Sequence, residues 1–67
     1  MTGDETEFPL SLGKVARREL AAHGITRFKQ LTEKTERELL AIHGVGPKAV
    51  RILDEELRSR GLSFREA

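Results

Sequence analysis

A glycine-containing segment between two stretches of helical periodicity is the part of this sequence best suited to chemistry. Residues 39–53 read LLAIHGVGPKAVRIL, in which two glycines flank Val45 and Lys48 follows Pro47. Proline is favoured at the first position of a helix, because its missing N–H would have no partner there. The segment therefore predicts a helix, a tight turn and a second helix that begins at Pro47.

The start of that second helix has the composition of an anion-binding site. Glycine tolerates positive φ angles, and we expect both Gly44 and Gly46 to adopt them. The first amides of a helix lack intrahelical partners and carry the positive end of the helix dipole, to which Lys48 adds a formal charge. With the Val45 side chain buried between the helices, the expected phosphate donors are the amides of Val45, Gly46, Lys48 and Ala49. Alternatively, the glycine-containing segment is only a corner that joins two helices and binds no phosphate.

Further basic residues stand near both predicted helix starts. Lys14, Arg17 and Arg18 share one helix face through their three- and four-residue spacing, and Arg51 follows Lys48 after one turn. These side chains are candidates for contacts to neighbouring phosphates. A solvated helix face explains them equally well.

The elements that must position these groups are predicted to be helices. Ser11 is the expected cap of a first helix, which ends before Gly24. Its apolar residues, which recur at helical spacing, are Leu12, Val15, Ala16 and Leu20.

Three more helices follow in the prediction. A brief one lies near residues 26–31, and Thr35 with Glu38 forms a capping box that begins the next. The last helix runs from Pro47 to about Arg60, and Gly61 closes it. The apolar residues expected in the core from this helix and the segment after it are Val50, Leu53, Leu57, Leu62 and Phe64.

A weak internal repeat relates the first and last helices. Leu12 and Gly13 align with Val45 and Gly46, and the same register aligns the pairs Ala16 with Ala49 and Leu20 with Leu53. The alignment indicates two related helical hairpins, and a chance match in so short a chain is the alternative.

Composition limits the classes of function. A chain of 67 residues encloses one core and leaves no room for an enclosed catalytic cleft, so we expect no enzyme and no small-molecule substrate. Cysteine is absent, and His23 and His43 each precede a glycine that ends a helix. We interpret them as caps rather than metal ligands, and we expect no metal or other cofactor. Phe8, Phe28 and Phe64 are expected in the core rather than as stacking platforms.

Charge is distributed unevenly along the chain. Residues 1–7 contain three acidic residues and no basic one, and residues 8–67 carry a net charge of +4. We expect a disordered acidic tail over 1–7 and one domain over 8–67. No apolar run is long enough for a membrane span, and the N-terminus lacks the features of a signal peptide, so we expect a cytoplasmic protein without a membrane partner.

LLAIHGVGPKA resembles the helix-hairpin-helix motif of DNA-binding proteins. A wider resemblance, over residues 10–64, is to the C-terminal domain of bacterial RNA polymerase alpha subunits, through HGIT, LT, TERELL, the hairpin and RGLSF. It implies an all-α, compact four- to five-helix fold of the SAM-like or tandem helix-hairpin-helix type, which grips DNA across the minor groove and also contacts regulators. Val15 stands where that family places its main minor-groove arginine, so the promoter role is not carried over.

Two functions of different classes remain. The first is binding of double-stranded DNA, without sequence specificity or with weak specificity, which would allow association with the nucleoid. The second is a protein-interaction module of the same fold that serves transcription or repair, and RNA binding is a third alternative. DNA binding requires Lys14 and Lys48 to lie on the same side of the domain.

Overall fold

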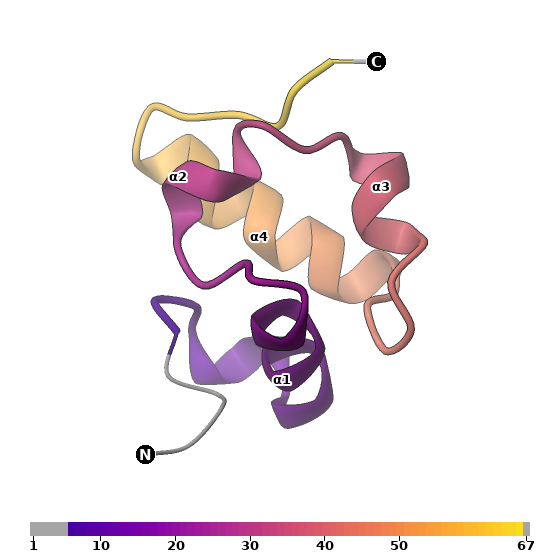
Figure 1. Cartoon of the computed structure of the whole chain (residues 1–67). Helices are drawn as coiled ribbons and strands as arrows, with labels where there is room; N and C mark the ends of the chain where they lie inside the picture. The colour runs from indigo at the N-terminus through magenta and orange to yellow at the C-terminus, as the bar shows by residue number, and fades with distance from the viewer. Residues whose placement is uncertain (1–5, 67) are drawn as a thin grey trace.

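The fold consists of short helices arranged around one longer helix (Figure 1). The computed structural model describes residues 6–66, and these contain helices and loops but no strand. The elements are a 3-10 helix, η1 (Leu10–Leu12), and the α-helices α1 (Lys14–Ala22), α2 (Phe28–Leu31), α3 (Glu36–Leu40) and α4 (Pro47–Ser59). The predicted all-α class and the four predicted α-helices are confirmed.

Leucines from every α-helix meet in the core. The fully enclosed side chains are Leu20 of α1, Leu31 of α2, Leu39 of α3, and Leu53 and Leu57 of α4. Burial of one such side chain stabilises a fold by roughly 1.5–3 kcal/mol. The core therefore depends on contacts between all four α-helices.

Two glycines end the longer helices as predicted. Gly24 follows α1 with φ +78°, and Gly61 follows α4 with φ +74°. In both places the next amide bonds back across the turn: Ile25 N–H donates to Leu20 O at 2.8 Å, and Leu62 N–H donates to Leu57 O at 2.8 Å. This pattern satisfies carbonyls that a helix end leaves without partners.

The start of α3 shows the predicted capping box. Thr35 N–H donates to Glu38 Oε1 at 2.8 Å, and Glu38 N–H donates to Thr35 Oγ1 at 3.1 Å. The bond from the Thr35 amide is the main reason why the pKa of the Glu38 carboxyl lies below its ordinary value, and the positive charges of Arg65 and Lys34 act in the same direction.

The start of α1 differs from the prediction in two respects. Ser11 does not cap this helix but lies within η1, and the cap position is taken by Gly13 with φ +101°. Val15, expected on the apolar face, is 47% exposed. The 3-10 turn accounts for the first difference, because it occupies residues that the predicted helix would have used and delays the helix start.

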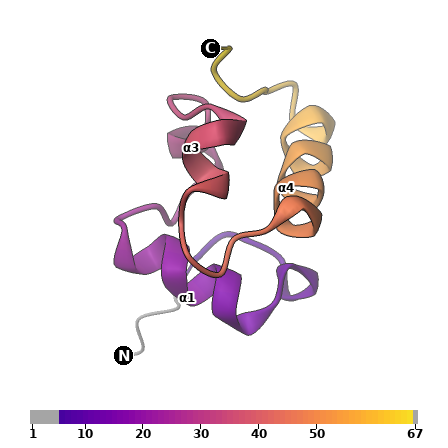
Figure 2. The same ribbon diagram turned by 90° about the vertical axis from the view of Figure 1, so that its right-hand side faces the viewer.

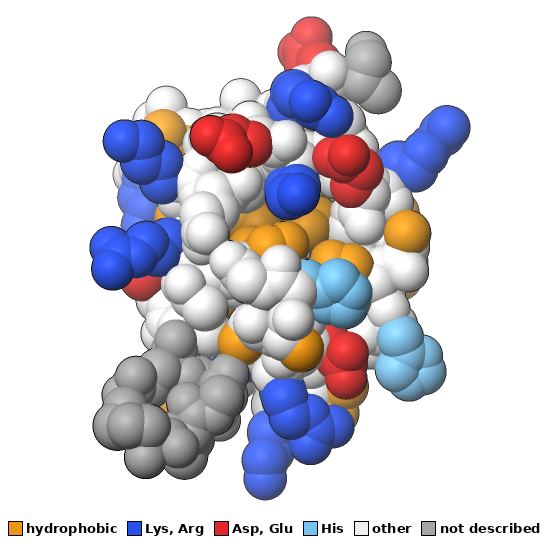
Figure 3. All heavy atoms as spheres, viewed as in Figure 1, with side chains coloured by type: hydrophobic (Ala, Val, Ile, Leu, Met, Phe, Trp, Pro, Cys, Tyr) orange, Lys and Arg blue, Asp and Glu red, His pale blue; other side chains and the backbone are white. Residues whose placement is uncertain are grey.

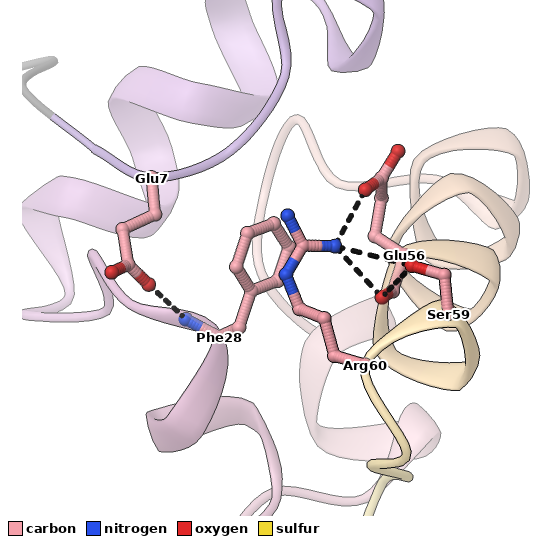
Figure 4. A network of polar contacts seen from close by, with 5 residues as sticks. All are labelled: Glu7, Phe28, Glu56, Ser59 and Arg60. Atoms are coloured by element: carbon pink, nitrogen blue, oxygen red, sulfur yellow. Dashed lines mark hydrogen bonds and ion pairs between the residues drawn. The ribbon is translucent and has the colours of Figure 1, made fainter.

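The three phenylalanines lie in the core, as predicted. Phe8, Phe28 and Phe64 are all buried, and the rings of Phe8 and Phe28 meet edge to face with centroids 5.2 Å apart. Arg60 covers the other side of this cluster, since its guanidinium carbon lies 4.0 Å from the Phe28 centroid (Figure 4). Leu62 is partly buried against the same core.

The segment before η1 is attached to α2. Glu7 N–H donates to Thr26 O at 2.9 Å, and Glu7 Oε1 accepts the Phe28 N–H at 2.9 Å (Figure 4). Glu7 of the expected tail is therefore bound to the domain, and residues 1–5 of that tail lie outside the described residues. α4, the longest helix of residues 6–66, falls short of the length and apolarity that a bilayer crossing needs, and so do the shorter helices.

Candidate nucleic-acid interface

The starts of α1 and α4 border one groove. The loop between α3 and α4 reaches the first turn of α1 (Figure 2), so Gly44 lies beside Val15, which is 29 residues away in sequence. The groove has a volume of about 410 Å³. Its lining includes Gly13, Lys14 and Val15 from α1 and Gly46, Pro47 and Lys48 from α4.

The charged residues that line the groove are both basic. Lys14 and Lys48 are the charged residues among those that line it, and both side chains are exposed. The described residues that form the lining include no carboxylate. The structure thus places the two lysines at the same groove, which is the arrangement that the DNA-binding hypothesis requires.

The two helix starts have the same order of residue types. Each begins after a buried aliphatic residue and a glycine at the cap position: Leu12 and Gly13 before α1, and Val45 and Gly46 before α4. The further pairs that the repeat aligns are also buried on both helices, Ala16 with Ala49 and Leu20 with Leu53. The internal repeat therefore relates positions that play the same structural part.

Glycine caps leave amides at both starts without partners in the helix. The first intrahelical bonds run from Arg17 N–H to Gly13 O at 3.1 Å and from Val50 N–H to Gly46 O at 3.0 Å. Neither helix has a hydrogen bond from a capping side chain within the described part of the chain. The amides that precede these bonds have no partner within their helices. Those of Lys14, Val15 and Lys48 belong to exposed residues and can donate to an anion, whereas Ala16 and Ala49 are buried.

Two details of the predicted cradle are wrong. Gly46 has φ −105° and ψ −175°, an extended conformation rather than a left-handed one. The Val45 amide is not free, because it donates to Ile42 O at 3.1 Å and closes the turn after α3. The Val45 side chain is buried as expected, so Val45 shapes the hairpin but offers no donor to a phosphate.

Gly44 has a packing role that the sequence did not reveal. Its φ of +87° is the positive angle predicted for it. A Cβ at this position would lie 2.8 Å from Val15 Cγ1 and 3.1 Å from Glu19 Cγ. The hairpin can therefore approach α1 only because residue 44 has no side chain.

The remaining predicted bases do not line the groove. Arg17 is half-buried on α1, and Arg18 and Arg51 are exposed on α1 and α4. Figure 3 shows Lys and Arg side chains gathered over α1 at the lower edge of that view. The groove thus unites two of the predicted bases, Lys14 and Lys48, and the others extend the positive surface beyond it.

Several polar side chains outside the groove make local structural contacts. His23 Nδ1 lies 2.9 Å from Glu19 O at the end of α1, as expected for a cap. On α4, Arg58 pairs with Asp54 at 2.9 Å and Arg60 pairs with Glu56 at 2.7 Å. Residues 6–66 contain no group of acidic or histidine side chains arranged to hold a metal ion.

The sequence analysis missed Gly13 and Val15 as parts of the interface. The repeat alignment could have identified Gly13, since it pairs this glycine with Gly46 of the hairpin. Val15 aligns with the minor-groove arginine of the family that the chain resembles, but its contact with Gly44 joins distant segments and was not predictable. Comparison of the chain with protein-family models, curated proteins and solved structures finds no match.

Proposed function

We propose that this chain is a DNA-binding module that contacts the backbone of duplex DNA through the groove between α1 and α4, without sequence specificity or with weak specificity. The observation that carries the proposal is the meeting of Lys14 and Lys48 at one groove whose lining holds no carboxylate. A phosphate is attracted both by these charges and by the uncapped amides of the two helix starts. Contacts of this kind position a protein on DNA without reading its sequence.

The proposal includes a fold type. The two glycine-capped helix starts and the repeat that relates them support a tandem helix-hairpin-helix domain of SAM-like shape, similar to the C-terminal domain of RNA polymerase alpha subunits. Val15 is apolar, so it offers no charged or hydrogen-bonding group to a base edge. Weak specificity follows, since sequence is read through contacts to bases or through DNA shape.

Binding of a short fluorescent DNA duplex, followed by anisotropy at several salt concentrations, tests this function. Replacement of either groove lysine, Lys14→Gln or Lys48→Gln, should weaken binding equally for unrelated sequences and reduce the slope of log affinity against log salt by about one unit. Lys29→Gln, on α2 and away from the groove, is the matched control. Wild-type affinity in both groove variants would reject the groove as the DNA site.

A hollow beside α3 favours a second function, the binding of a protein partner. An open hollow of about 580 Å³ lies between α3, α4 and residues 63–66, and Leu40 at its edge is 45% exposed. An exposed leucine beside a hollow suits a protein partner better than DNA. Acidic side chains such as Asp54 also line the hollow, and they would repel a polyanion. A Leu40→Ser variant that loses a protein partner but keeps DNA affinity would establish this function beside the first.

A further inference from the structure

We propose that His43 is a further DNA-binding residue, whose imidazole strengthens backbone binding at the groove between α1 and α4 when it is protonated. This inference rests on the proposed function, because it adds a charge to the same interface. It starts from the position of His43 in the loop between α3 and α4, which reaches α1 (Figure 2). His43 is exposed, and it directly precedes Gly44, which lines the groove.

The two histidines of the chain have the same sequence context but different contacts. Each precedes a glycine with a positive φ, +78° at Gly24 and +87° at Gly44. His23 Nδ1 lies 2.9 Å from Glu19 O and caps the end of α1. The cap predicted for His43 is wrong, because its side chain makes no hydrogen bond or ion pair with residues 6–66. Its imidazole therefore has no structural task that would prevent contact with a ligand.

Charges of both signs surround the loop that carries His43. Glu19 of α1 packs against this loop, since its Cγ lies 3.1 Å from the position that a Cβ of Gly44 would take. The basic residues of α1 and of the first two turns of α4 are Lys14, Arg17, Arg18, Lys48 and Arg51. The charged residues of α3 line the separate hollow or form the capping box, and they are Glu36, Arg37 and Glu38. A positive charge on His43 would therefore add to the basic residues and offset Glu19.

The charge of an imidazole changes within the range of about pH 5 to pH 8, whereas lysine and arginine stay charged throughout it. Exposed charges act on one another over about 10 Å at 0.1 M salt. The Cα atoms of residues 43 and 44 are about 3.8 Å apart, so a charge on His43 would lie within about this range of a phosphate in contact with Gly44. Protonation should therefore tighten backbone binding and steepen its dependence on salt.

The test measures the affinity of the full chain for a short DNA duplex by anisotropy at about pH 5.5 and about pH 8, at constant ionic strength. The wild type should bind about two- to fivefold more tightly at the lower pH, the effect of one exposed ionic contact. His43→Gln should lose this difference. His43→Lys carries its charge at both pH values, so at the higher pH it should bind about as tightly as the wild type does at the lower one.

His23→Gln is the matched control, because His23 is the other histidine of the chain and lies at the end of α1 that does not line the groove. It should keep the wild-type response to pH, and circular dichroism should show that all variants are folded at both pH values. A response that survives in His43→Gln, or a His43→Lys variant no tighter than wild type at the higher pH, would overturn this inference while the DNA-binding function stood. If the folded wild type bound no duplex at either pH, the proposed function itself would fail, and the contribution of His43 with it.

Discussion

The backbone of Gly44 lies directly against the side chain of Val15, with 2.8 Å between Val15 Cγ1 and the position that a Cβ of residue 44 would take. This contact joins the hairpin to the first turn of α1 and thereby brings Lys14 and Lys48 to one groove. The geometry of the proposed interface thus depends on the absence of a side chain at residue 44.

Replacement of Gly44 by alanine should destabilise the domain. A left-handed φ costs an alanine roughly 1–2 kcal/mol, and the contact with Val15 adds to this cost because something must shift to admit the Cβ. We therefore expect the free energy of unfolding in urea to fall by at least about 1 kcal/mol in Gly44→Ala.

Gly46→Ala is the control for that experiment. Residue 46 is extended, and a Cβ there would meet no heavy atom within 4 Å. The entropy that alanine removes from the unfolded chain and the weaker capping by alanine offset each other, so stability should change by less than about 0.5 kcal/mol. Similar losses in the two variants would mean that the hairpin does not approach α1 as described.

The charge on Glu38 should make the stability of the domain depend on pH. The pKa of this carboxyl is lower in the folded chain than its ordinary value of 4.5, chiefly because it accepts the Thr35 N–H. Its contribution is therefore present above pH 4.5 and is lost as pH falls through the lower pKa of the folded state. Glu38→Gln should be less stable than wild type at pH 7, and the difference should shrink as pH falls below 4.5.

Urea titrations at several pH values measure this dependence. Glu36→Gln removes the same charge from the same helix turn but leaves the capping box in place, so its pH profile should follow that of the wild type more closely. A constant difference between Glu38→Gln and wild type from pH 7 to pH 3 would contradict the assignment.

Arg60 should contribute more to stability than its neighbour Arg58. The guanidinium of Arg60 covers the Phe28 ring at 4.0 Å and also bonds Glu56 (Figure 4), whereas Arg58, which pairs with Asp54, is exposed. Cation–π contacts at exposed sites are worth about 0.5–1 kcal/mol, and exposed ion pairs of this spacing are worth about 0.3–0.5 kcal/mol. Thermal unfolding should therefore show a larger loss in Arg60→Ala than in Arg58→Ala, and the reverse order would contradict this view.

Helix ends were the features that local sequence predicted best. The capping box at Thr35, the start of α4 at Pro47 and the closing glycines Gly24 and Gly61 all depend on residues within one turn of each other. Their hydrogen bonds form inside the segment that carries the signal. The structure therefore confirms these predictions.

Features that depend on long-range packing were not predictable in this way. A glycine permits a left-handed φ without requiring one, so the sequence could not show that Gly46 is extended. The 3-10 turn competes with the Ser11 cap and moves the start of α1 to Lys14. The sequence could not separate the groove lysines from the other predicted bases, because all of them are basic residues near a helix start. Only the packing of the hairpin against α1 brings Lys14 and Lys48 to the groove and leaves out Arg17, Arg18 and Arg51.

The central claim is that the groove between α1 and α4 binds duplex DNA. An amide chemical-shift titration of the labelled chain with a short duplex at low salt, repeated at higher salt, tests it most directly because it reports affinity and location together. We predict salt-sensitive shifts at Lys14–Ala16 and Gly46–Ala49, with little change along residues 54–60. No shifts at low salt, or shifts confined to α3 and the C-terminal half of α4, would contradict the claim.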